Sequence, residues 1–116
     1  SEAIANAAIE VIINQTTPEI DKDALVEIVK KSTLKEMRLR LVTKMVQSTS
    51  DKEVIAELLN LLGGIYSEIA ARETRPKVEV NAENKVLLEI LKAKGFISSY
   101  PKIKEGSYWR IYYPTT

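Results

Sequence analysis

The sequence contains no cysteine and no histidine. Without cysteine there can be no disulfide and no thiolate metal ligand, and without histidine the commonest general base and neutral metal ligand are missing. The sequence also lacks the glycine-rich phosphate-binding patterns, the nucleophile motif G-x-S-x-G and the calcium-loop pattern D-x-D-x-D-G. A carboxylate-only magnesium site or a serine–lysine pair stays open. We nevertheless expect a protein that is not an enzyme and that has no metal and no cofactor.

Long hydrophobic runs are absent as well. No apolar run approaches the roughly 18 residues that a membrane span needs, and the acidic start lacks the basic region of a signal peptide. A chain of 116 residues with 45% apolar and 28% charged residues is ordinary for one soluble domain. We expect a single compact domain over residues 1–116, located in the cytoplasm, with no membrane partner and no small-molecule substrate.

The net charge of +1 hides an alternation along the chain. Residues 1–21 hold four acids and no base, whereas residues 22–48 hold seven bases and three acids. Residues 49–71 hold four acids and one base, whereas residues 72–116 hold nine bases and five acids. Because local charge sets the potential that a polyanion meets, the two basic segments are compatible with a nucleic-acid partner.

Apolar residues recur at helical spacing in the first part of the chain. The expected helices cover residues 3–13, residues 18 or 22 to 31, residues 34–48 and residues 51–72. Capping boxes at Thr33 and Ser50, each with a glutamate three residues later, start the last two helices. Gly63 and Gly64 in the last helix predict a kink or the close approach of another backbone segment.

The pattern changes after Pro76, which cannot continue a helix. Residues 77–80, KVEV, alternate like a short strand, and a helix capped by Asn81 follows. The segments FISSYPKI and SYWRIYY then predict a β-hairpin with Gly106 in its turn. The expected fold class is α+β: a bundle of about four helices in residues 1–73, then a strand–helix–hairpin unit in residues 74–116 with a small three-stranded sheet.

A helix followed by a β-ribbon also suggests a winged helix, but the expected strand at 77–80 separates the two helices nearest the hairpin. The order helix, strand, helix, strand, strand instead resembles the N-terminal module of the eighth small-subunit ribosomal protein, from Asp51 to about Tyr113. The similar stretches are DKEVIAELL, VEV and NKVLLEILKAKGFISSY, above all the helix that ends in a lysine, a glycine, Phe96 and Ile97. Residues 1–50 have no counterpart. The resemblance implies RNA binding.

The second strand of the hairpin holds most of the aromatic residues. Side chains alternate along a strand, so Trp109 and Ile111 share one face. Tyr108, Arg110 and Tyr112 share the other. We expect the first face to be core and Arg110 to be exposed, because a guanidinium group is rarely buried without a partner. The tyrosine face is either buried by helices or available for stacking on nucleic-acid bases.

From these patterns we expect a small nucleic-acid-binding protein, with RNA slightly favoured over DNA. The predicted binding residues are Tyr108, Arg110, Tyr112, Lys102, Lys104 and Lys85. A second basic face, which fits a solvated helix surface equally well, consists of Lys35, Arg38, Arg40 and Lys44. The alternative is a protein-interaction or assembly subunit, docking through its helical half onto a protein partner or a second copy, since tyrosine, tryptophan and arginine are also common at protein interfaces.

Overall fold

The computed structural model describes residues 2–14, 23–24, 27, 35–98 and 107–115. Its helices are α1 (Glu2–Ile13), α3 (Lys35–Gln47), α4 (Lys52–Leu62), α5 (Gly64–Ala71) and α6 (Lys85–Ala93). Its strands are β1 (Lys77–Glu79) and β2 (Tyr108–Arg110), which pair antiparallel. The α+β class is therefore confirmed. The helix expected over residues 18 or 22 to 31 lies mostly outside the described residues, and so does the expected hairpin turn at Gly106.

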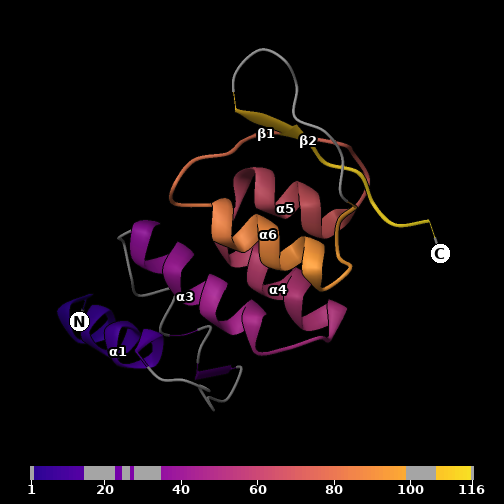
Figure 1. Cartoon of the computed structure of the whole chain (residues 1–116). Helices are drawn as coiled ribbons and strands as arrows, with labels where there is room; N and C mark the ends of the chain where they lie inside the picture. Colours follow the sequence, from indigo (N-terminus) through magenta and orange to yellow (C-terminus); the bar gives the residue numbers. More distant parts are fainter. Residues whose placement is uncertain (1, 15–22, 25–26, 28–34, 99–106, 116) are drawn as a thin grey trace.

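The helices α3, α4, α5 and α6 pack together into one body, and the two strands lie at one end of it (Figure 1). Helix α1 contacts α3 on the side of the body away from the strands (Figure 1). Apolar faces of the helices and the inner face of the strands form a continuous core, which the amphipathic spacing predicts. The buried apolar side chains are Met37, Leu41, Val42, Val46, Ile55, Leu58, Leu59, Ile69, Val78, Leu87, Leu88, Leu91, Phe96, Ile97, Trp109 and Ile111.

The helix expected over residues 51–72 is broken in two at the pair of glycines. Gly63 and Gly64 have φ angles of 73° and 53°, and Gly63 has a ψ angle of −169°, a combination that almost only glycine adopts. Among the described residues, a Cβ atom at either position would meet no atom within 4 Å. The predicted kink is confirmed in a stronger form, and the alternative of a closely approaching backbone segment is wrong. The backbone conformation itself requires glycine here.

Two helix starts differ from the predicted capping positions. The cap of α4 is Asp51 and not Ser50, because the Asp51 Oδ1 atom accepts the backbone N–H two residues further on at 2.9 Å. Asn81 accepts the N–H of Asn84 at 3.0 Å, but it does so in the turn before α6. The buried Asn84 side chain then donates to the Glu79 carbonyl oxygen at 2.8 Å, which ties the start of α6 to the end of β1.

The end of α6 follows the sequence expectation. Gly95 has a φ angle of 74°, and the Phe96 N–H donates to the Leu91 carbonyl oxygen at 2.8 Å. Both features are typical of the Schellman motif, in which a glycine ends the helix. Phe96 and Ile97 are both buried directly after it. This junction turns the chain from α6 back towards the strands.

The strands β1 and β2 form a two-stranded ribbon in which Val78 lies opposite Trp109. Two further backbone bonds extend it: the Ile111 N–H donates to the Pro76 carbonyl oxygen at 2.9 Å, and the Val80 N–H donates to the Ser107 carbonyl oxygen at 2.7 Å. The predicted three-stranded sheet is not shown: the described residues contain only this pair. Ser98 donates to the Tyr112 carbonyl oxygen at 2.9 Å, and the rest of the predicted third strand, from residue 99 on, lies outside the described residues.

Candidate functional site

The inner face of the ribbon belongs to the core. Val78, Trp109 and Ile111 are exposed by only 2%, 7% and 0% of their surface. The tryptophan ring lies against α6, where the Lys92 ammonium nitrogen is 4.9 Å from the ring centroid. The expectation that Trp109 and Ile111 are core residues is confirmed, and the ribbon is anchored to the helical body through them.

The outer face of the ribbon is charged and accessible. Lys77 and Arg110 are exposed, Tyr108 is half-buried, and Tyr112 keeps 39% of its surface exposed. The predicted exposure of Arg110 is confirmed. The alternative in which helices bury the tyrosine face is wrong, because Tyr112 is exposed and the described helices form the core with the opposite face of the ribbon.

Each aromatic residue of the C-terminal segment has a cation over its ring. A cation over an aromatic face at such distances contributes about 0.5–1 kcal/mol at exposed sites. The distances from the charged group to the ring centroid are 5.2 Å for Arg72 over Tyr113, 5.0 Å for Arg75 over Tyr112, 4.9 Å for Lys77 over Tyr108 and 4.9 Å for Lys92 over Trp109. The clustering of aromatic residues therefore matches a clustering of cations, three of which come from residues 72–77, just before β1 and at its first position.

Hydrogen bonds hold this segment in place. Arg110 donates through Nη1 to the Arg75 carbonyl oxygen at 2.9 Å, which joins β2 to the residues before β1. The Tyr113 hydroxyl donates to the Glu68 carbonyl oxygen at 3.4 Å. The pKa of Tyr113 is raised above its ordinary value, chiefly by burial. The charge of Arg72 opposes this shift, and the charge of Glu68 adds to it. The aromatic segment is thus tied to α5 and to the residues just before β1.

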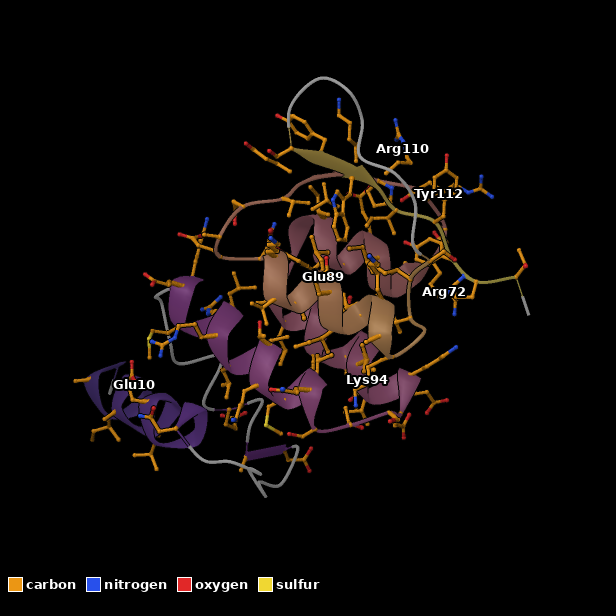
Figure 2. All side chains as sticks on the ribbon, viewed as in Figure 1. Glu10, Arg72, Glu89, Lys94, Arg110 and Tyr112 are labelled. Carbon is orange, nitrogen blue, oxygen red and sulfur yellow. The ribbon has the colours of Figure 1, made fainter. Side chains whose placement is uncertain are left out.

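The charges on the outer face include a pair of like sign. Lys77 and Arg110 lie directly opposite each other in the ladder, and among the described residues neither forms an ion pair with a carboxylate. We call Arg75, Lys77, Tyr108, Arg110 and Tyr112 the cationic ribbon face. Figure 2 shows Arg110 and Tyr112 on the opposite side of the molecule from α1.

Of the other predicted site residues, Lys85 is not part of this face. Lys85 is exposed at the start of α6, and Lys102 and Lys104 lie outside the described residues. The basic residues of α3 line two hollows that share the acidic residue Glu83. Lys35 and Arg38 line a hollow of about 250 Å³ with Tyr66, whereas Arg40 and Lys44 line one of about 240 Å³ with Val86.

Arg40 has a local partner as well. Its Nη1 atom forms an ion pair with Glu10 of α1 at 3.0 Å, between side chains that are each almost half exposed. This contact links α1 to α3. It gives Arg40 the role of a surface ion pair, as the sequence reading of a solvated helix face allows.

Three cations near the ribbon were missed in the sequence: Arg72, Arg75 and Lys77. Their spacing around Pro76, R-x-x-R-P-K, places them just before and within the first strand. A strand that pairs with an aromatic strand brings its flanking cations to the rings. The signal was therefore present in the sequence, but only the antiparallel pairing of β1 with β2 joins its two halves.

Neither metal ligands nor a membrane-spanning helix was found in the part of the chain that the structure describes. There, no group of three or more carboxylates is placed to hold a metal ion. None of the helices in the same ranges combines the length and the apolar character of a transmembrane segment. The predicted absence of enzymatic activity, metal and cofactor stays a prediction.

The chain is similar to a short part of a longer bacterial protein. The chain is 33% identical over 93 residues to the "Uncharacterized membrane protein YobI" of Bacillus subtilis (strain 168). The match covers 80% of this chain but only 8% of the relative, so the chain spans a small part of that much longer protein. No family model and no solved structure matches.

This match overturns several expectations from the sequence. The relative is named a membrane protein, which points away from a nucleic-acid-binding function, a nucleic-acid partner, a cytoplasmic location and the exclusion of a membrane partner. These predictions are wrong. They depended on an alternation of charge and on tyrosines beside arginine, and the same residues suit other anionic surfaces equally well. The resemblance to the ribosomal module is not addressed by the comparison and stays a prediction.

Proposed function

We propose that this chain is a module of a membrane-associated protein and that it contacts the anionic surface of a bilayer through the cationic ribbon face. The observation that carries the proposal is the outer face of the ribbon. There, exposed Lys77 and Arg110 lie beside Tyr112, and cations stack on the tyrosine rings. The relationship to a protein named as a membrane protein supports the same conclusion.

The residue types on this face suit the head-group region of a membrane. Tyrosine is enriched where water meets the bilayer, because its ring is apolar and its hydroxyl is polar. Lysine and arginine near a surface of anionic lipids contribute about 1 kcal/mol each. Stacking on Tyr108 and Tyr112 directs the Lys77 and Arg75 side chains along the outer face instead of leaving them to sample many rotamers.

The expected affinity of this face alone is low. The cations of this face, Arg75, Lys77 and Arg110, are partly offset by the exposed Glu79 on the same side of β1, which leaves a net charge of +2 from three bases minus one acid. At about 1 kcal/mol per charge, the gain is on the order of 2 kcal/mol, or about 30-fold in binding. Such a contact orients a module that is already held near the membrane, because tethering raises its effective concentration.

We also infer that Ser98 begins the third strand of the sheet. Its N–H bond to the Tyr112 carbonyl oxygen at 2.9 Å supports this inference. A strand in that position would pair with the chain around Tyr112 and would hold this residue on the outer face.

Sedimentation with lipid vesicles tests the proposed function. We expect the chain to sediment with vesicles that contain phosphatidylglycerol, not with pure phosphatidylcholine vesicles, and to be released by added salt. The triple variant Arg75→Gln, Lys77→Gln, Arg110→Gln should lose this binding. A control with the same change in charge, Lys35→Gln, Lys52→Gln, Lys85→Gln, replaces exposed lysines of α3, α4 and α6 and should bind like the parent. Equal binding by the two triple variants would contradict the proposal.

A further inference from the structure

We propose that Lys77, Arg110 and Arg75 form a binding site for a phosphate group, so that the ribbon recognises phosphate and not negative charge in general. This inference rests on the proposed function and names the chemical group that the ribbon would contact. The structural basis is the register of the ribbon, which sets Lys77 directly opposite Arg110.

A like-charge pair at directly opposed positions of a ladder is unfavourable, because the two Cβ atoms are only about 4.5–5.5 Å apart. Exposed sheet faces commonly avoid it by placing an acid opposite a base. Here the acid on the same face, Glu79, lies opposite Tyr108 instead. Among the described residues, Lys77 and Arg110 have no carboxylate partner. An anion bound between them would relieve their repulsion.

The third cation is positioned by the same hydrogen bond that orders Arg110. Arg110 Nη1 donates to the Arg75 carbonyl oxygen at 2.9 Å, so the two arginines are adjacent although they are far apart in the chain. The Arg75 guanidinium lies over the Tyr112 ring at 5.0 Å. Its position beside the ribbon is therefore fixed from two sides, by a ring and by a backbone contact.

The donor set favours phosphate over a carboxylate. A guanidinium group presents five N–H donors in a planar fork, and the bond to Arg75 uses one of those on Arg110. The remaining donors can form paired hydrogen bonds to two phosphate oxygens, and a lysine ammonium adds a point charge to a third. The phosphate can belong to a lipid head group or to a free phosphate ester.

The first experiment compares lipids of equal charge density. Vesicles that carry phosphatidic acid, phosphatidylglycerol or oleate are adjusted to the same surface potential and titrated with the chain. A phosphate site predicts about tenfold tighter binding to phosphatidic acid than to oleate, the scale of one charge-assisted hydrogen-bonded pair. Equal binding to all three would overturn the phosphate site and would leave the proposed function standing.

The second experiment replaces Arg110 by lysine, which keeps the positive charge but removes the planar guanidinium group with its paired N–H donors. Arg110→Lys should bind oleate vesicles as the parent does but should lose most of the preference for phosphatidic acid. The control is the opposite exchange, Lys52→Arg, at an exposed position on α4. It should change neither the binding to oleate vesicles nor the preference for phosphatidic acid. Circular dichroism melting confirms that both variants are folded. An Arg110→Lys variant that keeps the full phosphate preference would contradict the proposal.

A third arm separates the two sources of phosphate. Inorganic phosphate and glycerol 3-phosphate are added to the labelled chain at constant ionic strength, and the amide resonances of Lys77 and Arg110 are followed by NMR. Shifts that saturate for phosphate but not for chloride support the site. A response to the free esters without binding to any vesicle would overturn the proposed function and would identify a soluble ester as the ligand. No response to either source would overturn the phosphate site.

Discussion

The two groups of basic residues in this molecule differ in their surroundings. On α3, Arg40 pairs with Glu10, and the acidic Glu83 borders both the hollow of Lys35 and Arg38 and the hollow of Arg40 and Lys44. On the ribbon, cations lie over aromatic rings and Lys77 lies opposite Arg110. The number of charges is similar in both groups, so the number alone does not identify a binding surface.

The neighbours of each charge make the difference. A cation beside a carboxylate is partly neutralised, and such exposed pairs contribute little to stability. A cation on an aromatic ring keeps its full charge and gains a fixed position. The ribbon therefore presents ordered positive charge to the solvent, whereas Arg40 uses its charge to hold α1 against α3.

The largest expected effect concerns the anchor of the ribbon. Trp109→Ala should cost about 3–5 kcal/mol of unfolding free energy, because it removes a large side chain that is only 7% exposed. Urea unfolding measures this loss. Tyr112→Ala, on the outer face of the same segment, should cost less than about 1 kcal/mol. Similar losses for both variants would show that the two faces of the ribbon do not differ as described.

The break between α4 and α5 should give the next largest effect. Gly63→Ala places a Cβ atom on a backbone with φ of 73° and ψ of −169° and should cost about 1–3 kcal/mol. Gly64→Ala, at φ of 53°, should cost about 1 kcal/mol, because alanine tolerates the left-handed helical region better. Chemical unfolding of both variants checks the order. A neutral Gly63→Ala would mean that α4 and α5 can join into one helix.

A tyrosine with a raised pKa lies next to each group of basic residues: Tyr66 beside the α3 group and Tyr113 beside the ribbon. The pKa of Tyr66 is raised, chiefly by burial, and its hydrogen bond to Asn84 opposes this shift. Tyr66 borders the hollow that Lys35 and Arg38 line. Because the folded pKa lies above the unfolded value of about 10, this stabilisation is complete below pH 10. It is lost as the pH rises through the folded pKa. The free energy of unfolding should therefore fall between pH 9 and 12, with a slope set by the release of about one proton for each tyrosine whose pKa is raised. Tyr66→Phe should make this fall less steep.

The smallest effect should come from the α3 group. Arg40→Gln removes an ion pair between half-exposed side chains and should cost about 0.2–1 kcal/mol, less at high salt. Glu10→Gln should give the same loss, and the double variant should not add to it. Thermal unfolding at low and high salt tests this. A loss of unfolding free energy above about 2 kcal/mol that does not depend on salt would contradict the description of this contact as a surface ion pair.

Much of the fold could be predicted because local patterns and the final packing agree. The apolar spacing predicted α1, α3, α6 and the start of α4 to within a few residues, and period-2 alternation placed Trp109 in the core. Gly63 shows where this reasoning ends. A glycine pair marks a break, but the φ and ψ angles that separate a kink from two helices depend on the packing of α5.

The candidate site was harder to predict because its charges come from two distant segments. Arg110 stands out beside the tyrosines of β2, whereas Arg75 and Lys77 precede it by more than thirty residues. Only the register of the ribbon shows that Lys77 lies opposite Arg110. The type of anionic partner could not be read from these residues either, since lipid and nucleic acid both offer phosphates to arginine.

The most direct test of the account measures which residues approach a bilayer. The ¹⁵N-labelled chain is mixed with phosphatidylglycerol bicelles that carry a paramagnetic head group, and the broadening of each amide resonance is recorded. The account predicts strong broadening for residues 75, 77–79 and 108–112 and little for α1 and α3. Broadening centred on α3, or none that depends on phosphatidylglycerol, would contradict it.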